Sequence, residues 1–129
     1  MQQAAQAYGK VAQQTLGPRE LEAHVLLKAA TRLQRVRDAW DERQGELDEA
    51  LTYNRKLWTV LATAATADTN PLPREIKQNI GNLGIFVFKR TVEVMMAPTP
   101  EKLDALVNIN REIAAGLRAM PPAPAPAEA

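Results

Sequence analysis

The spacing of apolar residues between positions 47 and 65 constrains the fold more than any other feature of the chain. At the period of an α-helix, these residues fall on two adjacent stripes that together cover roughly half of the helix circumference. The first stripe consists of Leu47, Ala50, Leu51, Asn54, Trp58, Leu61 and Ala65, and the second of Tyr53, Leu57, Val60 and Ala64. One neighbouring helix usually covers a narrower arc. We therefore predict that this helix either is central in an all-α fold or also binds a partner.

Helical periodicity continues through most of the chain, while the signals of β-strands are scarce. There is no sustained apolar/polar alternation and no Asn-Gly or Asp-Gly hairpin turn. Pro18, Pro73 and Pro100 suit the first positions of new helices, because proline lacks the N–H that such a position leaves unpaired. The sequence predicts an all-α domain of about five helices, at approximately 3–16, 18–42, 46–67, 73–96 and 100–119.

The chain length and its last ten residues define the expected domain organisation. A length of 129 residues fits one domain. Alternating Pro and Ala after Met120 provide no side chains that could form a core, so the segment is expected to be extended and mobile. We predict one helical domain over residues 1–119 and a disordered tail over residues 120–129.

The segment at 73–96 carries apolar residues on two nearly opposite sides of its predicted helix. One stripe contains Ile76, Ile80, Leu83, Val87 and Val94, and the other contains Ile85, Phe88, Val92 and Met95. Gly81 and Gly84 lie beside the second stripe. Glycine inside a helix costs stability, so the two glycines predict the close approach of another helix backbone. The pattern predicts a helix sandwiched between two others.

The residue types do not favour catalysis or cofactor binding. The chain has no cysteine, which excludes disulfides and thiolate ligands, and His24 has no second histidine with which to complete a metal site. The glycines at 81 and 84 lie within a predicted helix and not in a phosphate-binding loop before one. Most carboxylates have a basic neighbour within four residues, a pattern typical of solvated ion pairs. We predict a protein that is not an enzyme and has no cofactor.

Charge and hydropathy constrain partners and location. The net charge is +1, and the cluster of Arg32, Arg35, Arg37 and Arg43 is interleaved with acidic residues. This arrangement indicates a solvated helix face and does not favour direct nucleic-acid binding. The N-terminus lacks the basic end and apolar run of a signal peptide, and no apolar run is long enough to span a membrane. We expect a cytoplasmic protein with no membrane span.

Several short motifs, in order along the chain, carry a resemblance to a known family. They are Ala7-Tyr8, Pro18-Arg19-Glu20-Leu21-Glu22-Ala23, Ala50-Leu51-Thr52-Tyr53-Asn54-Arg55-Lys56-Leu57-Trp58, Leu72-Pro73 and Leu83-Gly84-Ile85-Phe86-Val87. The chain resembles FlaF, the small flagellar biosynthesis regulator of alphaproteobacteria. The resemblance implies a role like that of a flagellin-specific secretion chaperone, with FlbT as a second partner. The alternative is a post-transcriptional regulator of flagellin synthesis that acts through FlbT or flagellin mRNA.

The apolar helix surface fits the capture of an amphipathic partner, which docks its apolar face into a groove. We expect the third and fourth predicted helices to form the groove walls, with Tyr53, Asn54, Leu57, Trp58, Ile85, Phe86 and Phe88 as the partner-binding residues. For Tyr53 and Trp58 a core position remains open, since large aromatic residues serve equally in cores and at interfaces. A homodimer formed through the surplus apolar stripe is a third interpretation.

Overall fold

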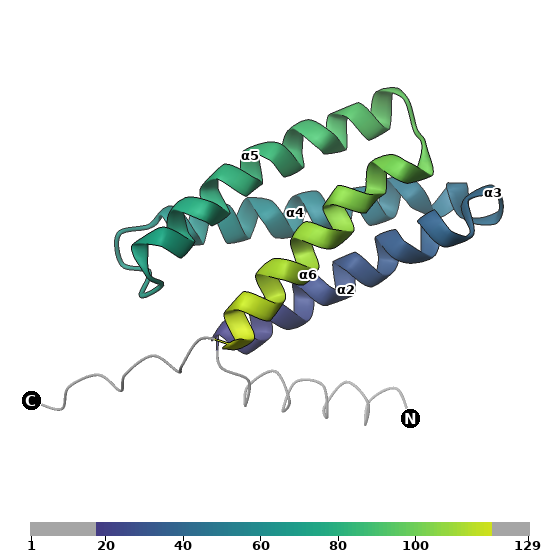
Figure 1. The fold of residues 1–129 in the computed structure, drawn as a ribbon. Helices are drawn as coiled ribbons and strands as arrows, with labels where there is room; N and C mark the ends of the chain where they lie inside the picture. The colour runs from purple at the N-terminus through teal and green to yellow at the C-terminus, as the bar shows by residue number, and fades with distance from the viewer. Residues whose placement is uncertain (1–17, 120–129) are drawn as a thin grey trace, which may run out of the picture.

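The computed structural model describes residues 18–119, and within this range every regular element is helical (Figure 1). The elements are α2 Pro18–Asp38, α3 Trp40–Arg43, η1 Gln44–Glu46, α4 Leu47–Thr66, α5 Arg74–Met96, η2 Pro100–Lys102 and α6 Leu103–Ala119. The all-α prediction is confirmed for this range. The helix predicted at 3–16 and the tail predicted at 120–129 lie outside the described residues.

The prediction of one continuous helix over 18–42 is wrong, because the backbone leaves the helical region at Ala39. This residue has φ −123° and ψ 48°, and it separates α2 from the single turn of α3. Trp40 directly follows the break and packs, partly buried, against the core. Tertiary packing of this large side chain outweighs the weak local preference for a continuous helix.

The start of the last helix also differs from the prediction. Pro100 opens a short 3-10 turn, η2, and the α-helix proper begins at Leu103. Thr99 is the N-cap residue of this turn and has extended backbone, but its side chain makes no capping hydrogen bond. A 3-10 turn at a helix N-terminus is common and adds only a small boundary difference.

The four long helices form two antiparallel pairs. Helices α4 and α5 are connected as a hairpin and lie side by side, and α6 lies along α2 (Figure 1). The C-terminal end of α6 lies beside the N-terminal end of α2, where Arg118 and Glu20 form an ion pair of 3.5 Å. Because α2 also packs against α4, the two pairs enclose one hydrophobic core. Side chains from all four long helices are completely buried there, among them Leu26, Leu33, Trp58, Ile80, Val87 and Leu106.

Gly84 allows α4 and α5 to approach closely. A Cβ atom at this position would lie 3.3 Å from the Cβ of Ala62 and 3.8 Å from the Trp58 ring. At Gly81 a Cβ atom would meet only the Thr66 methyl group, at the ordinary contact distance of 3.8 Å. The predicted close approach is therefore confirmed at Gly84 and is weaker at Gly81.

The prediction that the fourth helix is sandwiched between two others is wrong. α5 buries one face, with Ile80, Val87 and Val94 completely covered, mainly against α4. The side chains of Ile85 and Val92, on the opposite stripe, remain exposed. The second apolar stripe, which we predicted to pack against another helix, is thus largely exposed in the described part of the chain.

Candidate functional site

Two of the predicted partner-binding residues, Asn54 and Trp58, lie in the core and have no exposed surface. The Trp58 Nε1–H donates a hydrogen bond of 2.8 Å to the Oδ1 of Asn110. The Asn110 amide donates in turn to the Oδ1 of Asn54 at 2.7 Å and to the carbonyl of Leu26 at 3.2 Å. This buried polar cluster of Leu26, Asn54, Trp58 and Asn110 connects α2, α4 and α6.

Asn110 is the residue of this cluster that the sequence interpretation missed. It lies three and four positions after Val107 and Leu106, and four before Ala114, all of them buried. Helical spacing therefore places Asn110 on the buried face of α6. A buried polar residue is expected to have hydrogen-bond partners. An asparagine on the buried face of a predicted helix is therefore the sequence signal that could have identified Asn110. The Nδ2 of Asn54 has no partner among the described residues.

Tyr53 and Leu57 lie at the border between core and surface. Both are partly buried, and Leu57 packs against the core. The guanidinium of Arg32, from α2, lies 4.4 Å from the centroid of the Tyr53 ring, a distance suited to a cation–π contact. Tyr53 therefore presents its ring to another side chain of the same molecule.

The three predicted site residues on α5 point to different surroundings. Phe88 is partly buried against the core, and Phe86 is partly buried with the Arg90 guanidinium 5.2 Å from its ring. Ile85 is 69% exposed. Because Asn54 and Trp58 contribute no surface, the seven predicted residues do not line one open groove in this structure.

Four of the five large apolar side chains that are exposed among the described residues lie on α5. We call these four the α5 stripe; they are Ile85, Val92, Met95 and Met96, which are 69%, 53%, 62% and 81% exposed. Their spacing of seven, three and one residues places them along one side of the helix over about three turns. Exposed apolar side chains scattered singly are ordinary, whereas a contiguous group marks an interaction surface.

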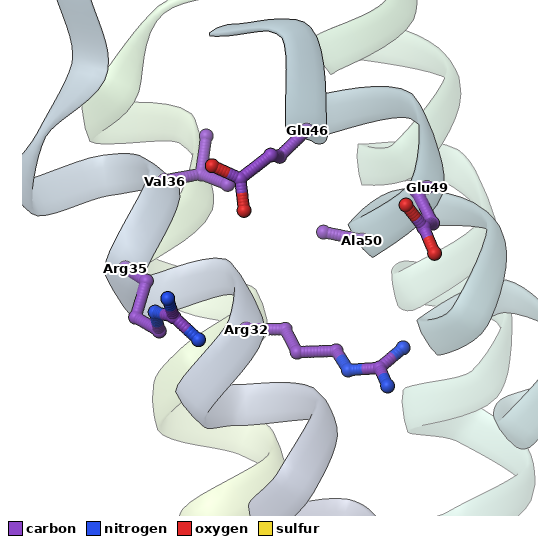
Figure 2. A pocket seen from close by; sticks show the side chains of 6 residues that line it. All are labelled: Arg32, Arg35, Val36, Glu46, Glu49 and Ala50. Atoms are coloured by element: carbon purple, nitrogen blue, oxygen red, sulfur yellow. The ribbon is translucent and has the colours of Figure 1, made fainter. Parts of the chain in front are cut away.

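A small cleft of about 160 Å³ lies between α2 and the start of α4 (Figure 2). Arg32, Arg35 and Val36 of α2 form one wall, and Glu46, Glu49 and Ala50 form the other. Figure 2 shows Arg32 extending across the cleft toward α4, with the two carboxylates above it. The cleft is therefore charged on both sides, with cations on one wall and anions on the other.

The sequence comparison decides the family. Residues 4–117 match the family of the flagellar protein FlaF. This chain belongs to the FlaF family. No curated protein and no solved structure matches the chain significantly.

Membership of the FlaF family connects the protein to the bacterial flagellum, and the matched range covers the described helices except for the last two residues of α6. None of the helices over residues 18–119 of this FlaF-family chain is long and apolar enough to cross a membrane. Across the same residues, no group of three or more His, Cys, Asp or Glu side chains is placed to hold a metal ion. Two features of the described surface, the α5 stripe and the charged cleft, are accessible to a partner.

Proposed function

We propose that this FlaF-family protein binds flagellin in the cytoplasm and acts as its secretion chaperone, with the α5 stripe as the docking surface. The observation that supports the proposal is the exposure of Ile85, Val92, Met95 and Met96 along one side of a helix whose other side is buried. A flagellar protein that keeps such a surface open on a well-formed core is suited to protein–protein interaction.

The chemistry of the stripe fits a helical, amphipathic segment. Such segments dock apolar side chains at helical spacing onto an apolar surface, and the stripe offers contacts over about three turns. Covering a Val or Ile side chain completely contributes about 1.5–3 kcal/mol. Met95 and Met96 add flexible, polarisable side chains that adapt to partners of different shape. A partner that is disordered before binding loses conformational entropy on docking, which keeps the complex reversible for export.

In this proposal the protein acts by binding and not as an enzyme. Several ionisable side chains form surface ion pairs, for example Arg43 with Glu46 at 2.9 Å and Arg90 with Glu93 at 3.1 Å. The buried polar groups of Asn54 and Asn110 bond to one another and to backbone, in the packed interior. These groups stabilise the fold and supply no acid–base pair in an open site.

Co-expression with flagellin tests the proposal, followed by size-exclusion chromatography with light scattering at low and high salt. An apolar docking surface predicts a complex of defined mass that persists at high salt, because screening weakens only charge–charge contacts. Separate elution at both salt concentrations would contradict the proposal. That result would favour regulation through FlbT or flagellin mRNA, and FlbT would be the next partner to test.

A further inference from the structure

We infer that the charged cleft between α2 and α4 is a docking site for a carboxylate side chain carried on a helix of a partner protein. Arg32 and Arg35 would receive the carboxylate, and Glu49 would pair with a basic residue on the same helix. None of the six residues that line the cleft belongs to α5. The inference therefore goes beyond the proposed role of the α5 stripe and does not depend on it.

Arg32 is held in place in a way that leaves its hydrogen-bonding edge available. The Tyr53 ring supports the guanidinium at 4.4 Å, while Arg32 makes no hydrogen bond or ion pair with any described residue. A stacked guanidinium can still direct its planar N–H groups at a carboxylate. Because Tyr53 already restricts the side chain, less conformational entropy is lost when a ligand binds.

Arg35 lies one helical turn after Arg32, and its side chain has no ion-pair partner among residues 18–119. By contrast, ion pairs join Arg37 to Asp38 and Asp104, Arg43 to Glu46, Arg90 to Glu93 and Arg118 to Glu20. Glu49, on the opposite wall, likewise has no ion-pair partner among these residues. The cleft thus separates unpaired charges of opposite sign.

The apolar lining and the size of the cleft suit a side chain. Val36 and Ala50, one on each wall, are 1% and 4% exposed, so they belong to the core. A volume of about 160 Å³ corresponds to roughly five water molecules at about 30 Å³ each. A carboxylate side chain can displace such water and replace its hydrogen bonds with those of two guanidinium groups.

The acidic wall favours a protein helix over a nucleic acid. Glu46 and Glu49 face the arginines across the cleft. A chain of phosphates would bring only negative charge to this acidic wall, whereas a helix can bring a positive charge to it. A helix that carries Glu and Lys one turn apart offers a charge of the right sign to each wall. Charge complementarity therefore favours a helix with both an acidic and a basic side chain as the partner.

Side-chain NMR on the full chain tests this inference through the Arg Nε–Hε signals. The probes are a helix-stabilised peptide with Glu and Lys one turn apart, the same peptide with Gln in place of Glu, and a short single-stranded RNA. Arg35→Gln is the test variant. Arg111→Gln is the matched control, since Arg111 is an exposed arginine on α6 with no ion-pair partner among the described residues.

We expect the Glu peptide to shift the Arg32 and Arg35 signals saturably and the Gln peptide to leave them unchanged. Loss of one charge-assisted hydrogen-bonding group should weaken peptide binding about tenfold in Arg35→Gln and leave it unchanged in Arg111→Gln. Equal shifts with both peptides, or no shift with either, would overturn the inference. A stronger shift with RNA than with the Glu peptide would overturn it in favour of a polyanion site.

Discussion

The indole N–H of Trp58 donates a 2.8 Å hydrogen bond to the side-chain oxygen of Asn110, although 52 residues separate the two in sequence. Both side chains are completely buried. Asn110 also bonds to Asn54 and to the Leu26 carbonyl, so one amide satisfies groups on α2 and α4. A buried network of this kind stabilises the fold only while its members remain paired, because each orphaned polar group costs free energy.

Asn110→Ala should therefore lower the free energy of unfolding by about 3 kcal/mol or more, since it leaves the Trp58 N–H and the Leu26 carbonyl without their side-chain partner. Urea denaturation measures the change. Asn108→Ala is the matched control on the same helix, at an exposed position, and should change stability by no more than about 0.5 kcal/mol. Equal effects of the two substitutions would contradict the role of the network.

Trp58→Ala should lower the free energy of unfolding by about 3–5 kcal/mol, because it removes a completely buried aromatic side chain from the core. Thermal or urea unfolding followed by circular dichroism gives the value. A variant that unfolds like the wild type but no longer binds flagellin would instead place Trp58 at the interface.

Gly81→Ala should raise the free energy of unfolding by up to about 1 kcal/mol. Alanine is the better helix former, and its Cβ would make only an ordinary contact with Thr66. Gly84→Ala is the matched substitution one turn later, where the new Cβ would lie 3.3 Å from that of Ala62 and α5 would have to shift. It should therefore yield a smaller gain or a loss. A larger gain at Gly84 than at Gly81 would be inconsistent with the close approach of α4 and α5.

Burial raises the pKa of Glu22 above its ordinary value of 4.5, although the neighbouring Arg19 charge acts in the opposite direction. A carboxyl group with a raised pKa binds its proton more tightly in the folded than in the unfolded state. Its contribution to stability therefore decreases as the pH rises from 4.5 through the raised pKa.

Glu22→Gln removes this titration. The variant should gain stability relative to the wild type as the pH increases from about 4 to about 7. Urea denaturation across this range measures the difference. If the difference in unfolding free energy between the variant and the wild type stays constant with pH, Glu22 has the same pKa in the folded and unfolded states, which would contradict the prediction.

The sequence predicted the helices and their buried faces well, because apolar spacing reports directly which side of a helix is covered. The first apolar stripe of α4 is buried as a whole, from Leu47 to Ala65. The break at Ala39 was missed because it depends on where Trp40 packs, which is a tertiary effect. The second stripe of α5 was assigned to packing because one sequence does not distinguish an apolar face that meets a neighbour from one that remains exposed.

The candidate site was harder to predict for a related reason. Tyr53 and Trp58 have the same residue character and lie on the same helix, yet Trp58 is in the core and Tyr53 supports Arg32 at its edge. At roughly 100° per residue, the two positions lie about 140° apart around α4, and only the packing of the neighbouring helices decides which of them is buried. The cleft forms only where α2 and α4 lie beside one another, so the sequence pattern of either helix alone does not predict it.

The α5 stripe as the flagellin-docking surface is the central claim, and titration calorimetry with purified flagellin tests it most directly. The test variant is Val92→Ser, and the matched control is Val60→Ser on α4, where valine is also exposed, at 69% against 53% for Val92. Serine and valine have similar helix propensity, so both variants should unfold like the wild type. We predict that Val92→Ser weakens flagellin binding about tenfold, because it removes an apolar contact from the docked surface, and that Val60→Ser has less than about a twofold effect. Wild-type affinity in Val92→Ser would contradict the claim.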